Sequence, residues 1–205
     1  MASTCIVLSD STMRLSDVLK QYLKKTLAVE TVLNFVFRGK DSTYLIGENG
    51  VVKGIMPYSQ VNYLILSMGQ NDLNFLPSHG DMMVAKLTSQ IRENLCKFAT
   101  IHNHCEIIVL PLCKRKVNVL HYTYHVESKK PVYIKKINSA IDKYSQTLQA
   151  CECHSKSVFV TKPIQTHVRL TCRDGIHFSP EGKELVLTWA ISEYKKSKKK
   201  ENSCP

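Results

Sequence analysis

Five residues, spread along the chain, have the side-chain types that acyl transfer needs. A covalent mechanism requires a nucleophile, a base that deprotonates it, a group that orients the base, and donors for the oxyanion. Ser11 is a candidate nucleophile, His177 a candidate base because imidazole is neutral near pH 7, and Asp174 can orient that imidazole. The amide of Asn71 and the backbone N–H groups of Ser11 and Gly39 are candidate oxyanion donors, each typically worth about 3 kcal/mol.

Each of these residues also has an ordinary structural explanation. Ser11 precedes a helical pattern, so it suits the N-cap of that helix as well as a nucleophile turn. His177 alone suits a surface position, Asp174 a turn before Gly175, and Asn71 the start of a helix. The elements that position these residues therefore decide between the two explanations.

Short apolar, β-branched segments alternate with amphipathic segments from one end of the chain to the other. We expect strands at residues 5–8, 31–37, 61–69, 105–112 and 157–164. We expect helices at 12–27, 82–102, 132–151 and 179–196, the last capped by Ser179 with Pro180 at its first position. The first helix is expected to bury one stripe made of Leu15, Val18, Leu19, Tyr22 and Leu23. This alternation predicts an α/β fold in three layers, an α/β/α sandwich around a central five-stranded parallel sheet.

Ligands of such a sheet bind at the carboxyl ends of the strands, near the switch in strand order. The candidate residues follow different strands: Ser11 the first, Gly39 the second, Asn71 the third and the Asp174/His177 pair the fifth. All of them are therefore expected at one edge of the sheet. This agreement favours the hypothesis that Ser11 is a nucleophile over the hypothesis that it caps a helix.

Four motifs of the chain, "LSDST", "RGKDST", "MGQND" and "DGIHFSPEGKEL", resemble in order and position the four sequence blocks of SGNH (GDSL-type) hydrolases. The resemblance covers residue 5 to about residue 192. It implies a flavodoxin-like fold and ester hydrolysis through a covalent acyl-enzyme, without a metal or cofactor. Carried over motif by motif, it implies Ser11 as nucleophile, His177 as base oriented by Asp174, and Gly39 and Asn71 as oxyanion donors.

The resemblance implies a serine esterase acting on small acyl groups such as acetyl, with Asp10 and Gly69 in supporting positions. One motif departs from the family pattern, because Ser9 stands where the family usually has a glycine. Ser9 puts the geometry of the turn in question, since glycine turns tightly without a Cβ. An SGNH esterase domain also occurs in proteins of some LINE retrotransposons, and the basic charge would suit such a context or a virus-encoded one.

The net charge of +11 supports a second hypothesis, that the protein is a binding module with weak or no catalysis. Lysines gather in "KKSKKK", Lys195 to Lys200, within residues 195–205, which are expected to be a disordered tail after a hydrolase domain at 1–194. Three more basic clusters lie at 114–116, 129–130 and 135–136. Such a surface attracts nucleic acid or an anionic membrane. The tail would also suit a nuclear-import signal.

The remaining features narrow the class of protein. The sequence shows no signal peptide and no apolar stretch long enough to span a bilayer, so an intracellular location, cytoplasmic or nuclear, is expected. Eight scattered cysteines suggest reduced thiols. Cys151, Cys153 and His154 in "CECH" could bind zinc, but no second ligand pair supports a closed site. There is no Gly-rich phosphate loop or aromatic RNA-binding pattern.

Overall fold

The central feature of the fold is a parallel sheet of five strands. The computed structural model describes residues 3–10, 13–55, 61–74, 81–101, 103–114, 131–149, 158–162 and 177–201, with Ile164, Leu170 and Cys172. The strands are β1 (Thr4–Ser9), β2 (Thr31–Val36), β3 (Val61–Ser67), β4 (Glu106–Val109) and β5 (Val158–Val160), in the order β2-β1-β3-β4-β5. Every pair is parallel, which confirms the predicted α/β fold.

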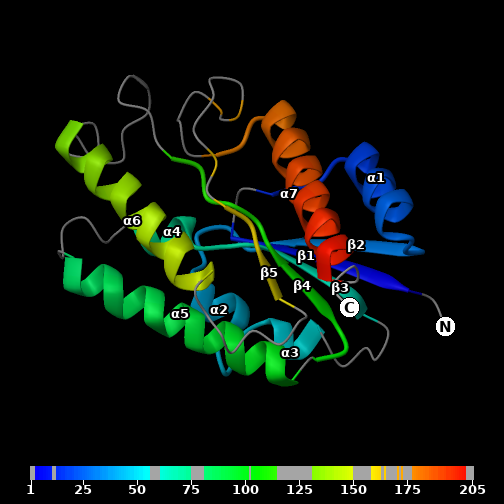
Figure 1. Cartoon of the computed structure of the whole chain (residues 1–205), viewed down its shortest axis with the longest axis horizontal. Helices are drawn as coiled ribbons and strands as arrows, with labels where there is room; N and C mark the ends of the chain where they lie inside the picture. The colour runs from blue at the N-terminus through cyan, green and yellow to red at the C-terminus, as the bar shows by residue number, and fades with distance from the viewer. Residues whose placement is uncertain are drawn as a thin grey trace.

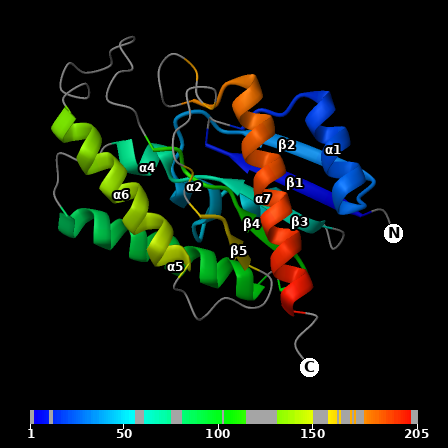
Figure 2. The same cartoon turned by 45° about the horizontal axis from the view of Figure 1, so that its top comes forward.

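Helices cover both faces of this sheet (Figure 1). One face carries α1 (Asp17–Leu27) and α7 (Pro180–Glu201), which lie side by side in Figure 2 as well. The other face carries α5 (Asp81–Ile101) and α6 (Pro131–Gln149), with the short helices α2 (Ser42–Ile46), α3 (Val52–Ile55) and α4 (Gln70–Asn74). The three-layer sandwich is therefore confirmed.

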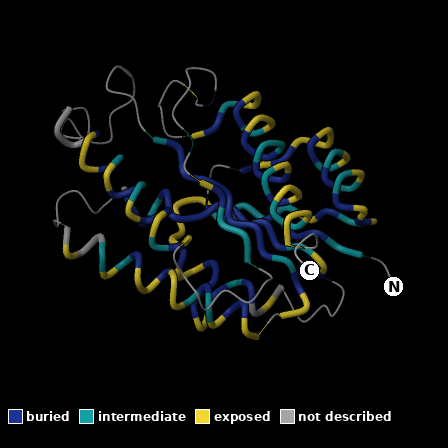
Figure 3. The backbone as a smooth tube through the Cα atoms, viewed as in Figure 1, coloured by how far each residue is buried: buried dark blue, intermediate teal, exposed yellow. Residues whose placement is uncertain are grey.

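Two apolar clusters, one on each face, hold the layers together. Successive residues of β1 point to opposite faces, so Ile6 and Leu8 join the cluster under α5 and α6, and Cys5 and Val7 join the one under α1 and α7. All four side chains are fully buried, and Figure 3 shows most of the inner strands in the colour of buried residues. A strand buried on both faces reads as a continuous apolar run, which is why "CIVL" was recognisable.

The first helix begins later than its pattern predicted. It starts at Asp17, and its N-cap is Ser16, whose side chain accepts a hydrogen bond from the N–H of Leu19. The residues before it are held in a non-helical path, because Asn34 on β2 accepts the N–H of Leu15 at 2.9 Å. The expected stripe is also wrong in part, since Val18 is 73% exposed. The buried side of the helix consists of Leu19, Leu23 and Leu27.

The last helix begins as predicted and ends later. The Ser179 hydroxyl accepts the N–H of Gly182 at 2.8 Å, which is the expected N-cap, and Pro180 is the first helical residue. The helix then continues to Glu201, through seven residues expected to be a disordered tail. Lys198 explains the difference, because it forms an ion pair with Glu106 of β4 at 3.1 Å and so fastens the basic segment to the sheet.

The cysteines depart from the expectation of reduced thiols at one position. Cys5, Cys105 and Cys113 are buried free thiols, and Cys172 is an exposed one. Burial raises the pKa of Cys105 to about 12 and that of Cys113 to about 11. Cys96, in contrast, is disulfide-bonded.

Other expected features fall partly outside the described part of the chain. The "CECH" segment, the basic pair 129–130 and Arg115 and Lys116 lie there. Lys135 and Lys136 are exposed on α6, whereas Lys114 is paired with Asp142 at 2.7 Å. Within the described helices, no segment is both long and apolar enough to cross a membrane.

Candidate active site

The strand order reverses between β1 and β3, and Asp10 connects the two strands at that point. Asp10 follows β1 directly, is fully buried, and donates its own N–H to the carbonyl of Ser67 at 3.0 Å. Its Oδ2 accepts the N–H groups of Gln70 at 3.2 Å and Asn71 at 3.4 Å, the first residues of α4. The crevice at such a switch point is where parallel sheets bind ligands. Asp10 is expected in a supporting position, and in the structure it joins two loops of the candidate site.

The candidate nucleophile Ser11 lies outside the described residues, but the residues that flank it are held firmly. The hydroxyl of Ser9 accepts the N–H of Met13 at 2.8 Å, which joins the described residues on either side of Ser11. Asn34 donates its amide to the carbonyl of Met13 at 3.1 Å. Since the N-cap of α1 is Ser16, Ser11 does not cap that helix, and the helix-cap explanation is wrong. For the same reason the dipole of α1 does not begin at Ser11.

Gly39 and Asn71, the two expected oxyanion donors, lie on loops that contact each other. Gly39 is exposed and has a φ of +71°, a left-handed conformation that favours glycine. The side-chain amide of Asn71 donates to the carbonyl of Lys40 at 2.9 Å, and more weakly to the carbonyl of Asp10 at 3.5 Å. A single amide group therefore brings together the loops that follow β1, β2 and β3.

The buried carboxylate of Asp72 makes a further contact between the loop of Gly39 and the loop of Asn71. Asp72 accepts the N–H of Ser42 at 3.0 and 3.2 Å and the hydroxyl of Ser42 at 2.7 Å. This contact links α4 to the start of α2, shortly after Gly39. Burial raises the pKa of Asp72, although the hydrogen bonds from Ser42 act against that shift.

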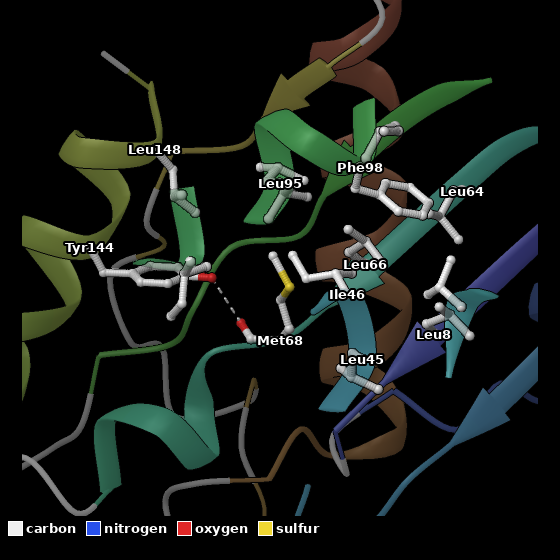
Figure 4. Packing of buried hydrophobic residues seen from close by; sticks show 14 of the residues in the cluster. Leu8, Leu45, Ile46, Leu64, Leu66, Met68, Leu95, Phe98, Tyr144 and Leu148 are labelled. Atoms are coloured by element: carbon white, nitrogen blue, oxygen red, sulfur yellow. Dashed lines mark hydrogen bonds between the residues drawn. The ribbon is translucent and has the colours of Figure 1, made fainter. Parts of the chain in front are cut away.

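The turn that leads to Asn71 rests on a buried tyrosine of α6. Gly69 has a φ of +99°, and a Cβ at this position would lie only 2.8 Å from the ring and hydroxyl of Tyr144. The Tyr144 hydroxyl donates to the carbonyl of Met68 at 3.4 Å, the dashed line in Figure 4. Burial raises the pKa of Tyr144, and the nearby carboxylates of Asp72 and Asp10 raise it further. Glycine is therefore required at position 69 by its backbone angle and by this close contact.

The candidate base His177 is exposed, on a loop closed by backbone hydrogen bonds. Its carbonyl accepts the N–H of Cys172 at 2.7 Å, and the carbonyl of Leu170 accepts the N–H of Ser179 at 3.0 Å. A Cβ on Gly182 would collide with the carbonyl oxygen of Leu170, so the first turn of α7 must approach this loop without a side chain. Asp174, between the two closing bonds in sequence, lies outside the described residues.

The apolar cluster under α1 and α7 brings the loops of Ser11 and His177 toward each other. Met13, two residues after Ser11, and Phe178, next to His177, are both buried in it. The structure thus joins Asn71 by direct contacts to Asp10 and to Lys40, the residue after Gly39. Phe178 of the His177 loop belongs to the same apolar cluster as Met13.

Three positioning residues were not identified from the sequence. Ser42 and Tyr144 looked like ordinary members of polar and amphipathic segments, and no local pattern pointed to them. Asn34 could have been found, because an amide interrupts the apolar run "TVLNFVF" that predicts a strand. A partly buried polar side chain needs hydrogen-bond partners, and those of Asn34 are backbone groups. Its amide donates to the carbonyls of Val7 and Met13, and its oxygen accepts the N–H of Leu15.

The sequence profile of the family described as GDSL-like Lipase/Acylhydrolase matches residues 9–190. The chain belongs to this family. In this GDSL-like hydrolase the match begins at Ser9, the last residue of β1. Among curated protein sequences, none matches significantly.

Solved structures share the fold of this GDSL-like hydrolase over nearly its whole length. The phospholipase A1 of Streptomyces albidoflavus NA297 superposes with a TM-score of 0.62 at 11% identity, covering 94% of this chain and 99% of the other. The lipase Lip_vut3 from a goat rumen metagenome gives a TM-score of 0.60 at 15% identity, with coverages of 95% and 96%. An extracellular lipase of Streptomyces rimosus gives 0.56 at 12% identity, with coverages of 94% and 99%. At these identities the likeness concerns the fold, while the family match makes the protein a serine hydrolase of the acylhydrolase type.

Proposed function

We propose that the protein is a carboxylic ester hydrolase that uses Ser11 as nucleophile and His177 as base. His177 accepts the proton of the Ser11 hydroxyl while the Ser11 oxygen bonds to the ester carbonyl carbon, which gives a tetrahedral intermediate. When the intermediate collapses, the bond to the alcohol breaks and His177 returns the proton to the leaving alcohol. Water then loses a proton to His177 and attacks the acyl carbon of the acyl-enzyme. As this second intermediate collapses, the bond to the Ser11 oxygen breaks, His177 returns the proton to that oxygen, and the acid is released. Asp174 orients the imidazole throughout.

The observation that carries this proposal is the meeting of Asp10, Lys40 and Asn71. It places the amide of Asn71 and the loop of Gly39 beside the residue that immediately precedes Ser11. The N–H of Gly39 has no acceptor among the residues that the structure describes, and the bond from Asn71 to Asp10 is long. Both donors can therefore turn to a developing oxyanion, with the N–H of Ser11 as a third donor.

For the substrate, we propose small acyl groups such as acetyl. Structural neighbours are named as a phospholipase A1 and as lipases, and those names describe those proteins. A panel of 4-nitrophenyl esters from acetate upward measures the preference of this protein. Highest kcat/KM on acetate supports the proposed acyl size, and a steady rise with chain length contradicts it.

The nucleophile is tested by labelling with a fluorophosphonate, which modifies activated serines. The wild type and Ser16→Ala, which removes only the cap of α1, should both be labelled at Ser11, whereas Ser11→Ala should be neither labelled nor active. Turnover of 4-nitrophenyl acetate and butyrate should follow the labelling. If the Ser11→Ala variant is still labelled, at another serine, then that serine and not Ser11 is the nucleophile.

A second candidate function, binding of nucleic acid, is favoured by a groove between β5 and α7. This groove has a volume of about 560 Å³, and its lining includes Phe159 and Trp189 together with Lys162, Lys196 and Lys199. Aromatic faces for stacking and ammonium groups for phosphates are what single-stranded nucleic acid requires. In this reading the hydrolase scaffold binds through its basic surface and the segment Lys195 to Lys200.

The second candidate is tested with a fluorescent single-stranded oligonucleotide. Binding should weaken steeply with added salt, survive Ser11→Ala, and weaken in Lys199→Gln more than in the control Lys25→Gln on α1. Anionic vesicles serve as the alternative ligand. Binding to vesicles but not to the oligonucleotide would show that the ligand is a membrane surface and not nucleic acid. No binding to either at low salt would reject this second function.

A further inference from the structure

We propose that the active site selects esters that carry an anionic group, a carboxylate or a phosphate, and that the ammonium of Lys40 binds this group. The inference rests on the proposed esterase function and adds the charge of the substrate to it. It follows from the position of Lys40, from the way its side chain is held, and from the balance of charges around the site.

The backbone of Lys40 is part of the candidate oxyanion site. Lys40 directly follows Gly39, and its carbonyl accepts the side-chain amide of Asn71 at 2.9 Å. An ester carbonyl that reaches these donors therefore lies within a side chain's length of Lys40. Any group attached a few bonds from the ester then comes close to the Lys40 ammonium.

An aromatic ring holds this ammonium. The Nζ of Lys40 lies 4.8 Å from the centre of the Tyr44 ring, within the range of a cation–π contact. Tyr44 is 40% exposed, and its ring packs edge-to-face against Phe37 at 5.6 Å. Among the described residues, no ion pair involves Lys40. The cation is thus kept at a defined place with its charge available to a ligand.

Three carboxylates on the loops of the candidate site accept hydrogen bonds from backbone N–H groups. Asp41 accepts the N–H of Tyr44 at 2.8 Å and so caps α2. Asp72 accepts hydrogen bonds from Ser42, and Asp10 accepts the N–H groups of Gln70 and Asn71. Each of these carboxylates therefore has its charge directed to a donor within the fold.

Exposed basic side chains lie on two of the loops around the candidate site. Arg38 precedes Gly39, and Arg14 lies in the segment between Ser9 and α1; both are exposed. With Lys40 they place positive charge on two of the loops that surround the candidate site, on a chain whose net charge is +11. A cleft with one sign of charge attracts substrates of the opposite sign.

The inference is tested with two pairs of esters that differ only in charge. In the first pair the alcohol part changes: a monoacylglycerol is compared with the monoacylglycerol phosphate of the same short acyl chain. In the second pair the acyl part changes: the ethyl ester of a monocarboxylic acid is compared with the monoethyl ester of the dicarboxylic acid of equal length. For each pair the ratio of kcat/KM, anionic over neutral, is measured by titration of the released acid.

We expect the wild type to prefer the anionic ester in at least one pair, and that pair identifies where the anionic group sits. In Lys40→Gln the ratio should fall about fivefold, the size of an exposed charge pair near 1 kcal/mol. Lys40→Arg should keep the preference, and Lys25→Gln, which removes the same charge at the other end of the sheet, should leave the ratio unchanged. In the wild type, added salt should lower the ratio without a mutation.

Two results would overturn the inference. One is a wild-type ratio that salt does not change in either pair, and the other is an equal ratio in Lys40→Gln and Lys25→Gln. In both cases, continued hydrolysis of the neutral esters would leave the proposed esterase function standing. Absence of hydrolysis of every ester, with no labelling of Ser11, would instead reject the esterase function itself.

Discussion

The carboxylate of Asp10 accepts the backbone N–H of Asn71 at 3.4 Å, across the point where the strand order of the sheet reverses. The residue before the candidate nucleophile and a candidate oxyanion donor are therefore joined by a direct contact. Because Asn71 also donates to Lys40, a displacement of any one of these loops is transmitted to the other two.

Replacing Asn71 by alanine should lower kcat with little effect on KM. The oxyanion exists only during the reaction, so loss of a donor costs transition-state stabilisation of about 3 kcal/mol, roughly a hundredfold in kcat. Steady-state kinetics on 4-nitrophenyl acetate measure this change. Asn62→Ala is the control, since Asn62 bonds to Thr4 at the opposite end of the sheet. Equal kinetics for the two variants would contradict a catalytic role of Asn71.

Replacing Ser9 by the glycine usual in the family should destabilise the protein. The substitution removes the acceptor of the buried N–H of Met13, and an unsatisfied buried donor costs about 1–3 kcal/mol. We expect Ser9→Ala to lose most of this free energy of unfolding in urea, and Ser9→Gly somewhat more because of added backbone freedom. A fall in kcat should accompany the loss. A Ser9→Gly variant as stable and as active as the wild type would show that the hydroxyl is dispensable.

Replacing Asp72 by asparagine should change how stability depends on pH. The pKa of Asp72 is raised in the folded protein above its ordinary value of 3.8, so the folded state binds this proton more tightly than the unfolded chain. Its contribution to stability is therefore full below pH 3.8 and is lost as the pH rises through the raised pKa. Urea unfolding from pH 3 to pH 8 should show the wild type losing free energy relative to Asp72→Asn in this interval. A difference in free energy of unfolding that stays constant with pH would rule out the shift.

Replacing Gly182 by alanine should disturb the His177 loop. The added Cβ meets the carbonyl of Leu170, so the first turn of α7 must move, at a cost of about 1–3 kcal/mol. Gly54→Ala is the matched control, because a Cβ at Gly54 meets nothing within 4 Å in the short helix α3. Thermal unfolding and kcat should both fall for Gly182→Ala and hold for Gly54→Ala. The reverse order would show that the contact with Leu170 relaxes freely.

The sequence was sufficient to predict the layers of the fold, because they depend on long periodic patterns. The run around Val7 is continuously apolar, the segment around Ile91 has a clear helical period, and both residues are fully buried. Short elements were missed, since α2, α3 and α4 have five residues or fewer and show no period. The start of α1 was placed too early because a side chain of β2, Asn34, holds the residues before it.

The site was predictable in part for a related reason. Gly39 and Asn71 could be placed at one edge because each directly follows a parallel strand, and topology alone then brings them together. The contact between Asp72 and Ser42 joins residues 30 positions apart in sequence, and no local pattern encodes it. The length of α7 was misjudged because its lysines are charged, whereas its order depends on the distant Glu106.

The hydrogen bond from Cys172 to the carbonyl of His177 has a practical consequence. Among the free cysteines of the described residues, Cys172 alone is exposed, while the other three are buried. The loop that carries the candidate base therefore contains a natural attachment point for a fluorophore or spin label. Motion of the base during turnover can be followed from a thiol that the protein already has.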